Sequence, residues 1–134
     1  MTLPTQEDYT NLLRFRTALR QFDSWSYEQA ARVGLTHAQH QLLLAVKGHP
    51  EPQGPTIRAV AGYLNTRHHS VVGLVDRAEQ ADLLRRCRDE EDGRVVRLML
   101  TEAGEDRIAR LSRLHLDELA RLAPLLEHLV DSAQ

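Results

Sequence analysis

The 134-residue sequence has one cysteine, one lysine and no long apolar run. The lone cysteine, Cys87, excludes a disulfide within the chain and a zinc site built from cysteines. Crossing a bilayer takes roughly 20 apolar residues in a row, and no segment approaches that length. The first 20 residues carry acids and arginines where a secretory signal has an apolar core. These absences predict a single cytoplasmic domain with no membrane partner.

The net charge of the chain does not indicate a nucleic-acid partner, because 17 basic and 19 acidic side chains leave a net charge of −2. Sixteen of the 17 basic residues are arginine. The planar guanidinium suits phosphates and guanine edges, although a GC-rich genome would produce the same excess. Seven arginines and seven acids cancel between residues 67 and 97. Any contact with DNA therefore depends on where single arginines are placed.

Hydrophobic periodicity predicts the helices. Apolar residues at helical spacing indicate a long helix over 7–31, with Leu12, Phe15, Leu19 and Phe22 on one stripe. Further helices are expected over 36–47, 56–64, 67–81 and 102–130. Thr36 and Gln39 fit a capping box at the start of the second helix. Pro124 is expected to kink or break the last helix.

A change of period from 3.6 to 2 after Asp82 predicts strands over 83–88 and 95–100. The polar residues 89–94 between them form the tip of a hairpin. Asn65 and Thr66 form a tight turn between the two short helices that precede the hairpin. Two such helices and a hairpin are typical of a winged helix. Its second helix fits a major groove, and its hairpin can place an arginine in the minor groove.

The stretch from Leu35 to Gly104 resembles the multiple antibiotic resistance regulator (MarR) family of bacterial transcription factors. Four motifs carry the resemblance: Gly34-Leu35-Thr36 opening a helix, the segment Arg67–Glu79 as recognition helix, Asp89, Asp92 and Arg94 in the wing, and the ending Leu100-Thr101-Glu102-Ala103-Gly104. Two positions depart from the family pattern. Asp82 replaces the usual glycine after the recognition helix, and Gly93 replaces an arginine of the wing. Because aspartate tolerates left-handed backbone better than most residues, we expect the turn at Asp82 to persist.

The resemblance implies a mainly α fold with a small β-hairpin wing (α+β), in which a winged helix-turn-helix is flanked by N- and C-terminal dimerisation helices. Residues 1–134 then form one MarR-like domain, with dimerisation helices over 7–33 and 102–131 and the winged helix-turn-helix over 36–101. It also implies a homodimer that binds a pseudo-palindromic operator in double-stranded DNA. A small-molecule effector would weaken this binding.

The residues predicted to bind DNA lie in the recognition helix and the wing. They are Arg67, His68, His69, Ser70, Val72, Arg77, Arg86, Asp92, Arg94 and Arg97. Val72 is expected to contact a thymine methyl, and Asp92 to orient Arg94. Two alternatives stay open: His68 and His69 could simply face solvent, and Arg77 could pair with an acid of the wing instead of a phosphate.

The residues predicted for an effector pocket are Phe15, Phe22, Trp25 and His40. At helical spacing the aromatic ones are more often part of a dimer core. His37 and His40 stand three residues apart on a helix, but no carboxylate partners are evident, so we expect no metal site and no cofactor. Cys87 lies in a predicted strand of the wing, and we expect it to have no sensing role.

The sequence therefore predicts a dimeric winged-helix transcriptional regulator, acting as a ligand-responsive repressor. The alternative is a winged-helix protein-protein interaction module without direct DNA binding, which the near-neutral charge permits. An enzyme is disfavoured, with no catalytic residues expected. The chain lacks a glycine-rich phosphate loop, a nucleophile elbow and a paired-carboxylate motif.

Overall fold

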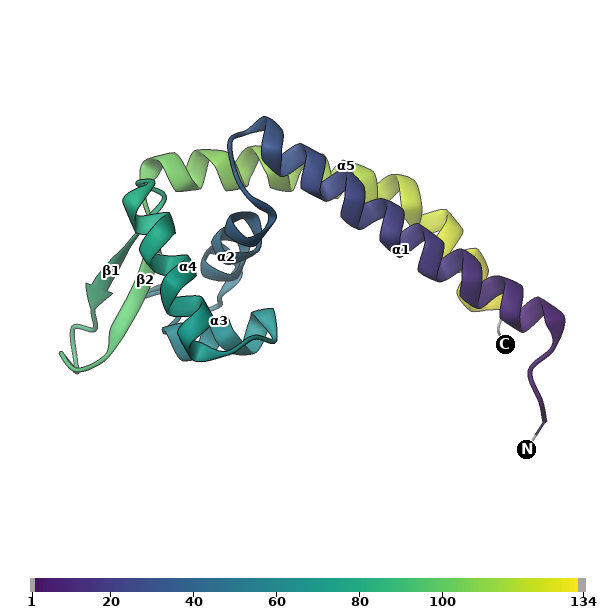
Figure 1. Ribbon diagram of the computed structural model, residues 1–134, viewed down its shortest axis with the longest axis horizontal. Coiled ribbons are helices and arrows are strands. Elements are labelled where there is room, and N and C mark those ends of the chain that lie inside the picture. Colours follow the sequence, from purple (N-terminus) through teal and green to yellow (C-terminus); the bar gives the residue numbers. More distant parts are fainter. Residues whose placement is uncertain (1, 133–134) are drawn as a thin grey trace.

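The computed structural model describes residues 2–132, which form five helices and one β-hairpin (Figure 1). The elements are α1 (Gln6–Arg32), α2 (His37–Gly48), α3 (Ile57–Leu64), α4 (His68–Gln80), β1 (Leu84–Arg88), β2 (Val96–Leu100) and α5 (Glu102–Ser132). Their order confirms the predicted mainly α fold with a small β-hairpin wing.

The molecule has a compact lobe and a long arm (Figure 1). The winged-helix lobe, residues 36–101, contains α2, α3, α4 and the hairpin. The arm consists of α1 and α5, which contact each other and run antiparallel, so that the start of α1 and the end of α5 lie far from the lobe. The first turns of α5 cover the lobe, where Ile108 and Leu111 are buried in its core.

Short polar side chains define where the helices begin. The Thr36 hydroxyl accepts a hydrogen bond from the Gln39 amide and the Gln39 side chain accepts one from the Thr36 amide, which confirms the predicted capping box. Thr56 caps α3 through the Ala59 amide. Asn65 and Asp82 adopt left-handed backbone, with φ of 50° and 58°. The turn expected at Asp82, after the recognition helix, is therefore present with aspartate at this position.

The core of the lobe lies where α2, α3, α4 and the hairpin meet. Its fully buried side chains include Leu42 and Leu43 of α2, Val60 of α3 and Val71 of α4. Leu98 of β2 completes this cluster from the hairpin side. Burial of these apolar side chains fixes the orientation of the hairpin against the helices.

A third segment pairs with the hairpin. β1 and β2 are antiparallel, with Arg86 opposite Leu98, and the Leu98 amide donates to the Pro55 carbonyl at 2.9 Å. The loop before α3 therefore lies along β2. Gly54 makes this approach possible, because its φ is +87° and an added Cβ would lie 2.0 Å from the Leu98 carbonyl oxygen.

Of the two effects predicted for Pro124, a kink or a break, the break does not occur. α5 continues from Glu102 to Ser132 with Pro124 inside it. A proline removes one backbone donor, and the turns on either side keep the remaining hydrogen bonds of the helix. None of the helices within residues 2–132 is long and apolar enough to span a bilayer.

Candidate nucleic-acid interface

Helix α4 has one buried and one exposed face. Val71, Leu74, Val75 and Ala78 are buried against the lobe. The opposite face carries the predicted DNA-binding side chains of this helix. Arg67, His68, His69, Ser70 and Arg77 are exposed there, and Val72 is half-buried.

The first turn of α4 lies at an edge of the lobe that faces away from the arm, together with α3 and the tip of the hairpin (Figure 1). Arg67 is the N-cap residue, and its side chain makes no capping hydrogen bond. Free backbone amides and the helix dipole make such a helix start attractive to phosphate. This edge can therefore meet DNA with the helix start and the wing tip at once.

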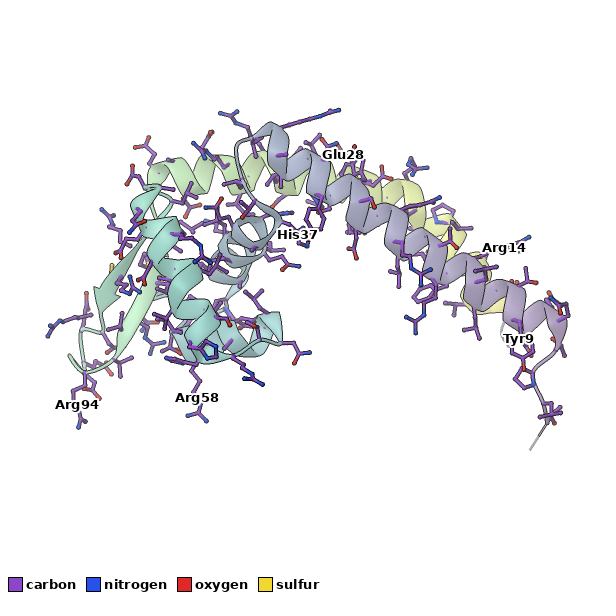
Figure 2. All side chains as sticks on the ribbon, in the orientation of Figure 1. Tyr9, Arg14, Glu28, His37, Arg58 and Arg94 are labelled. Atoms are coloured by element: carbon purple, nitrogen blue, oxygen red, sulfur yellow. The ribbon has the colours of Figure 1, made fainter. Side chains whose placement is uncertain are left out.

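The wing tip is held by two aspartates. The Asp89 carboxylate accepts hydrogen bonds from the backbone amides of Glu91 and Asp92, at 2.9 and 3.0 Å, and these bonds lower the pKa of Asp89. Asp92 accepts from Nε and the backbone amide of Arg94, at 3.2 and 3.1 Å. The Arg94 side chain is 92% exposed and points away from the arm (Figure 2). The predicted pairing of Asp92 with Arg94 is thus present.

Two of the arginines predicted to contact DNA make ion pairs within the lobe. Arg86 bridges Asp76, at 2.6 Å, and Glu79, which ties β1 to the end of α4. Arg97 bonds Asp89 Oδ2 at 3.0 Å and the Gly54 carbonyl at 3.2 Å, and its side chain is only 18% exposed. Both guanidinium groups are bonded to other segments of the lobe, and these bonds hold the wing in place.

The structure adds one residue that the sequence reasoning missed, Arg58. It is exposed on α3 and points from the same edge as Arg94 (Figure 2). Within residues 2–132 neither Arg58 nor Arg67 makes an ion pair. The first helix of a helix-turn-helix crosses the DNA backbone. That rule was the signal that could have identified Arg58.

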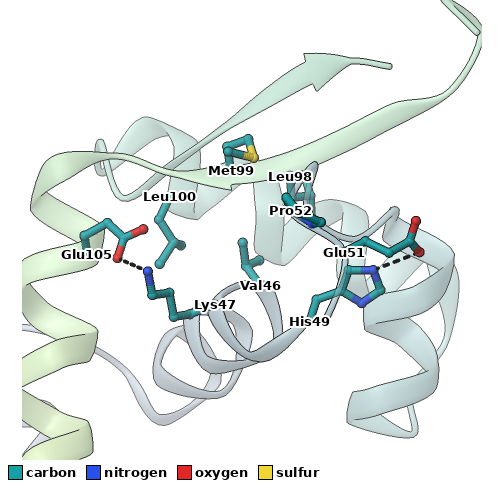
Figure 3. A pocket seen from close by; sticks show the side chains of 10 residues that line it. Val46, Lys47, His49, Glu51, Pro52, Leu98, Met99, Leu100 and Glu105 are labelled. Carbon is teal, nitrogen blue, oxygen red and sulfur yellow. Dashed lines mark ion pairs between the residues drawn. The ribbon is translucent and has the colours of Figure 1, made fainter. Parts of the chain in front are cut away.

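A polar network connects the wing to α3. His49 Nδ1 lies 2.8 Å from the Tyr63 hydroxyl, and His49 Nε2 lies 3.3 Å from Glu51. Glu51 in turn lies 3.9 Å from Arg97 Nη1. Figure 3 shows His49 and Glu51 beside a small pocket that β2 closes on the other side, with Lys47 and Glu105 paired across its mouth. These contacts bring Tyr63 of α3, the loop after α2 and Arg97 of β2 together at one side of the lobe.

Two of the predicted effector residues line one pocket, and a third lines a separate one. Phe22 and His40 line a pocket of about 380 Å³ where α1, α2 and α5 meet. The Trp25 ring lies 4.8 Å from the ring of His115, which also lines this pocket. Phe15 instead lines a second hollow near the far end of the arm. His37 stacks on Tyr27, at 3.8 Å between ring centroids.

These features define a winged-helix fold with arginines exposed at one edge, and the comparisons with known proteins agree on this fold. Residues 33–95 match the model of the MarR family. The CouR transcriptional repressor bound to a 23-mer DNA duplex is 27% identical, with a TM-score of 0.68 over 99% of this chain and 100% of that one. A MarR family protein from Bacillus stearothermophilus is 20% identical, with a TM-score of 0.77 over 98% and 96% of the two chains.

CouR from Rhodococcus jostii bound to p-coumaroyl-CoA is 20% identical, with a TM-score of 0.71 over 89% of this chain and 85% of that one. Among curated protein sequences, no significant match is found. The family model covers 63 of the 134 residues, and the solved structures share the fold, so the winged-helix part of this chain is similar to the MarR family.

Proposed function

We propose that the protein is a homodimeric repressor that binds a pseudo-palindromic operator in the cytoplasm and releases it when a small molecule binds. The observation that carries the proposal is the shared edge of the lobe, where the start of α4, Arg58 and Arg94 face away from the arm. The DNA duplex and the p-coumaroyl-CoA bound by CouR support the two kinds of ligand. No catalytic role is proposed.

The proposed contacts with DNA follow from this edge. Residues of the first turn of α4 would read bases in the major groove, and Arg94 would enter the adjacent minor groove, oriented by Asp92. Arg58 would bind phosphate. The remaining proposed contacts come from the recognition helix: Arg67, His68, His69, Ser70, Val72 and Arg77.

The arm supports the homodimer. Leu12, Phe15 and Leu19 share one face of α1 and are 60%, 40% and 43% exposed. On α5, Leu116 and Leu119 are 54% and 46% exposed. Large exposed apolar stripes of this kind mark interfaces, and a second copy offers the same stripe in return. Two lobes joined by their arms would contact half-sites about one helical turn apart, roughly 10 bp.

Removing a proposed contact with DNA should weaken binding in a way that depends on its role. We expect Arg58→Ala to reduce affinity for the upstream DNA of its own gene by a similar factor for all sequences. It should lower the salt slope by about 1.8, because the proposed dimer loses two phosphate contacts. Arg94→Ala should weaken binding most where the flanks are rich in A·T. Gel retardation at several salt concentrations measures both effects.

Arg110→Ala is the matched control, because Arg110 is exposed on α5 and pairs with Asp106 at 2.6 Å, away from the proposed interface. It should leave affinity unchanged. A lobe that binds protein and not DNA would give no salt-sensitive, competitor-resistant shift, and that result would overturn the proposed function.

Placing a charge on the apolar stripe of α1 should separate the dimer. We expect Leu19→Glu to shift the mass measured by light scattering from that of two chains toward one, because a buried unpaired carboxylate is strongly destabilising at an interface. Thr17→Glu adds the same charge at an exposed position off the stripe and should remain dimeric. A wild-type chain that is monomeric at micromolar concentration would contradict the proposed dimer.

A further inference from the structure

The pocket between α1, α2 and α5 is lined mainly by rings and leucines. Phe22 comes from α1, His37 and His40 from α2, and His115, Leu116 and Leu119 from α5. Its volume of about 380 Å³ compares with about 150 Å³ for a cavity that holds benzene. The pocket therefore has room for a substituted aromatic ring, and its walls offer faces and edges for such a ring to pack against.

The pocket wall holds no permanent positive charge. Although the chain has sixteen arginines, none lines this pocket within the described part of the chain, and Asp23 is its one ordinarily charged lining residue. Arginine and lysine are the usual partners of bound organic anions. An anion here would find only imidazoles, and it would face the Asp23 carboxylate.

The hydrogen bonds of His115 leave it no free donor. His115 Nδ1 lies 2.7 Å from the Leu111 carbonyl oxygen, which can only accept, so Nδ1 carries a proton. His115 Nε2 lies 2.7 Å from the Ser26 hydroxyl, and in the neutral ring it accepts that hydrogen bond. Both nitrogens of this ring are thus committed to groups of the protein.

His40 stays uncharged at neutral pH. Its side chain is buried, with the residue 6% exposed, and its ring centroid lies 4.8 Å from that of His115. Burial, followed by the charges of His115 and His37, lowers the pKa of His40 to about 4. The Nδ1 atoms of His37 and His40 are buried and have no hydrogen-bond partner among the described residues. The pocket wall therefore holds uncharged nitrogen atoms that could form hydrogen bonds with a ligand.

We infer that this pocket selects an uncharged aromatic effector and rejects the corresponding organic anion, an inference that rests on the effector-responsive regulator proposed above. A carboxylate entering the pocket would lose its water and gain no cation in return. A neutral amide or hydroxyl on the same ring loses far less hydration free energy than a carboxylate does. It can also form hydrogen bonds with the pocket wall.

The titratable groups that face the pocket are His37 and His40 from α2, His115 from α5 and Asp23 from α1. Because the pKa of His40 is lowered to about 4, its ring offers no cation to an anion at neutral pH.

Benzamide and benzoate form a matched pair of probes, because they share the ring and differ in charge at pH 7.5. The single tryptophan, Trp25, contacts His115, so its fluorescence reports binding in the full dimer. We expect benzamide to bind roughly tenfold or more tightly than benzoate at pH 7.5.

Ser112 lines the same pocket and allows a charge to be introduced. Ser112→Lys should remove or reverse the preference for benzamide, whereas Ser112→Gln, of similar size but neutral, should keep it. Benzoate binding as tightly as benzamide to the wild type would overturn the inference, and so would the absence of a signal from both up to their solubility limits. Gel retardation of the same samples tests DNA binding separately, so a failure of the repressor proposal would be visible as such.

Discussion

Gly54→Ala is expected to lower the free energy of unfolding by about 3 kcal/mol or more, although it adds a single methyl group. The new Cβ would lie 2.0 Å from the Leu98 carbonyl oxygen, and the backbone φ of +87° is unfavourable for alanine. The loop must move away from β2, which breaks the hydrogen bond between the Leu98 amide and the Pro55 carbonyl. Urea denaturation followed by circular dichroism measures the loss.

Gly62→Ala is the matched control for this substitution. Gly62 lies inside α3 and has open space around its Cα, so alanine there should stabilise the helix by about 0.5–1 kcal/mol. Gly54→Ala should also weaken DNA binding, because Arg97 of the wing bonds the Gly54 carbonyl. A Gly54→Ala protein as stable as the wild type would show that the loop does not pack on β2 as described.

Acidification from pH 7 to pH 4 is expected to remove roughly 3 kcal/mol of stability through His40 alone. The pKa of His40 is lowered from 6.5 to about 4 in the folded chain. Between these values the unfolded chain binds the proton and the folded chain does not, so the free energy of unfolding falls as the pH falls. The contribution is fully present above pH 6.5 and is lost as the pH approaches 4.

The difference between the wild type and His40→Gln isolates this effect, because glutamine does not titrate. Its free energy of unfolding, measured by urea denaturation at half-unit steps of pH, should vary less between pH 6.5 and 4. His68→Gln, at an exposed position at the start of α4, should keep the wild-type slope. Equal slopes for wild type and His40→Gln would mean that His40 is not buried at the junction of arm and lobe.

The junction of arm and lobe also suggests how an effector would act on DNA binding in the proposed repressor. The pocket is built from α1 and α5 of the arm and α2 of the lobe. A ligand held there contacts both parts and would favour one angle between them. Because the arms would join the two lobes, that angle would set the spacing of the two α4 helices on DNA.

Much of the fold could be predicted from the sequence because its signals are local. The capping box of Thr36 and Gln39 and the change of period after Asp82 each involve residues within a few positions of one another, and both appear in the structure. The left-handed turn after the recognition helix is present, with Asp82 in place of the usual glycine. Pro124 was the exception. α5 continues through it without a break, because the effect of a proline depends on the helix around it.

The roles of individual arginines could not be predicted in the same way. Arg86, Arg94 and Arg97 lie close together in the sequence, yet Arg94 is 92% exposed while the other two are bonded within the lobe. Strand alternation assigns a side chain to a face, but the partner on that face comes from another segment. Gly54, 43 residues before Arg97, supplies one such partner. Arg58 was missed because its direction became apparent only when α3 was placed beside the wing.

The sequence by itself determined the order of helices and strands, the winged-helix class and the positions that start each helix, since short-range hydrogen bonds and periodicity decide these. Only the tertiary structure decided which arginines are exposed at the edge of the lobe and what surrounds His40. Ser26 and His115 are 89 residues apart in the chain and 2.7 Å apart in space. Charge, burial and proton affinity depend on such distances, which no local pattern in the sequence contains.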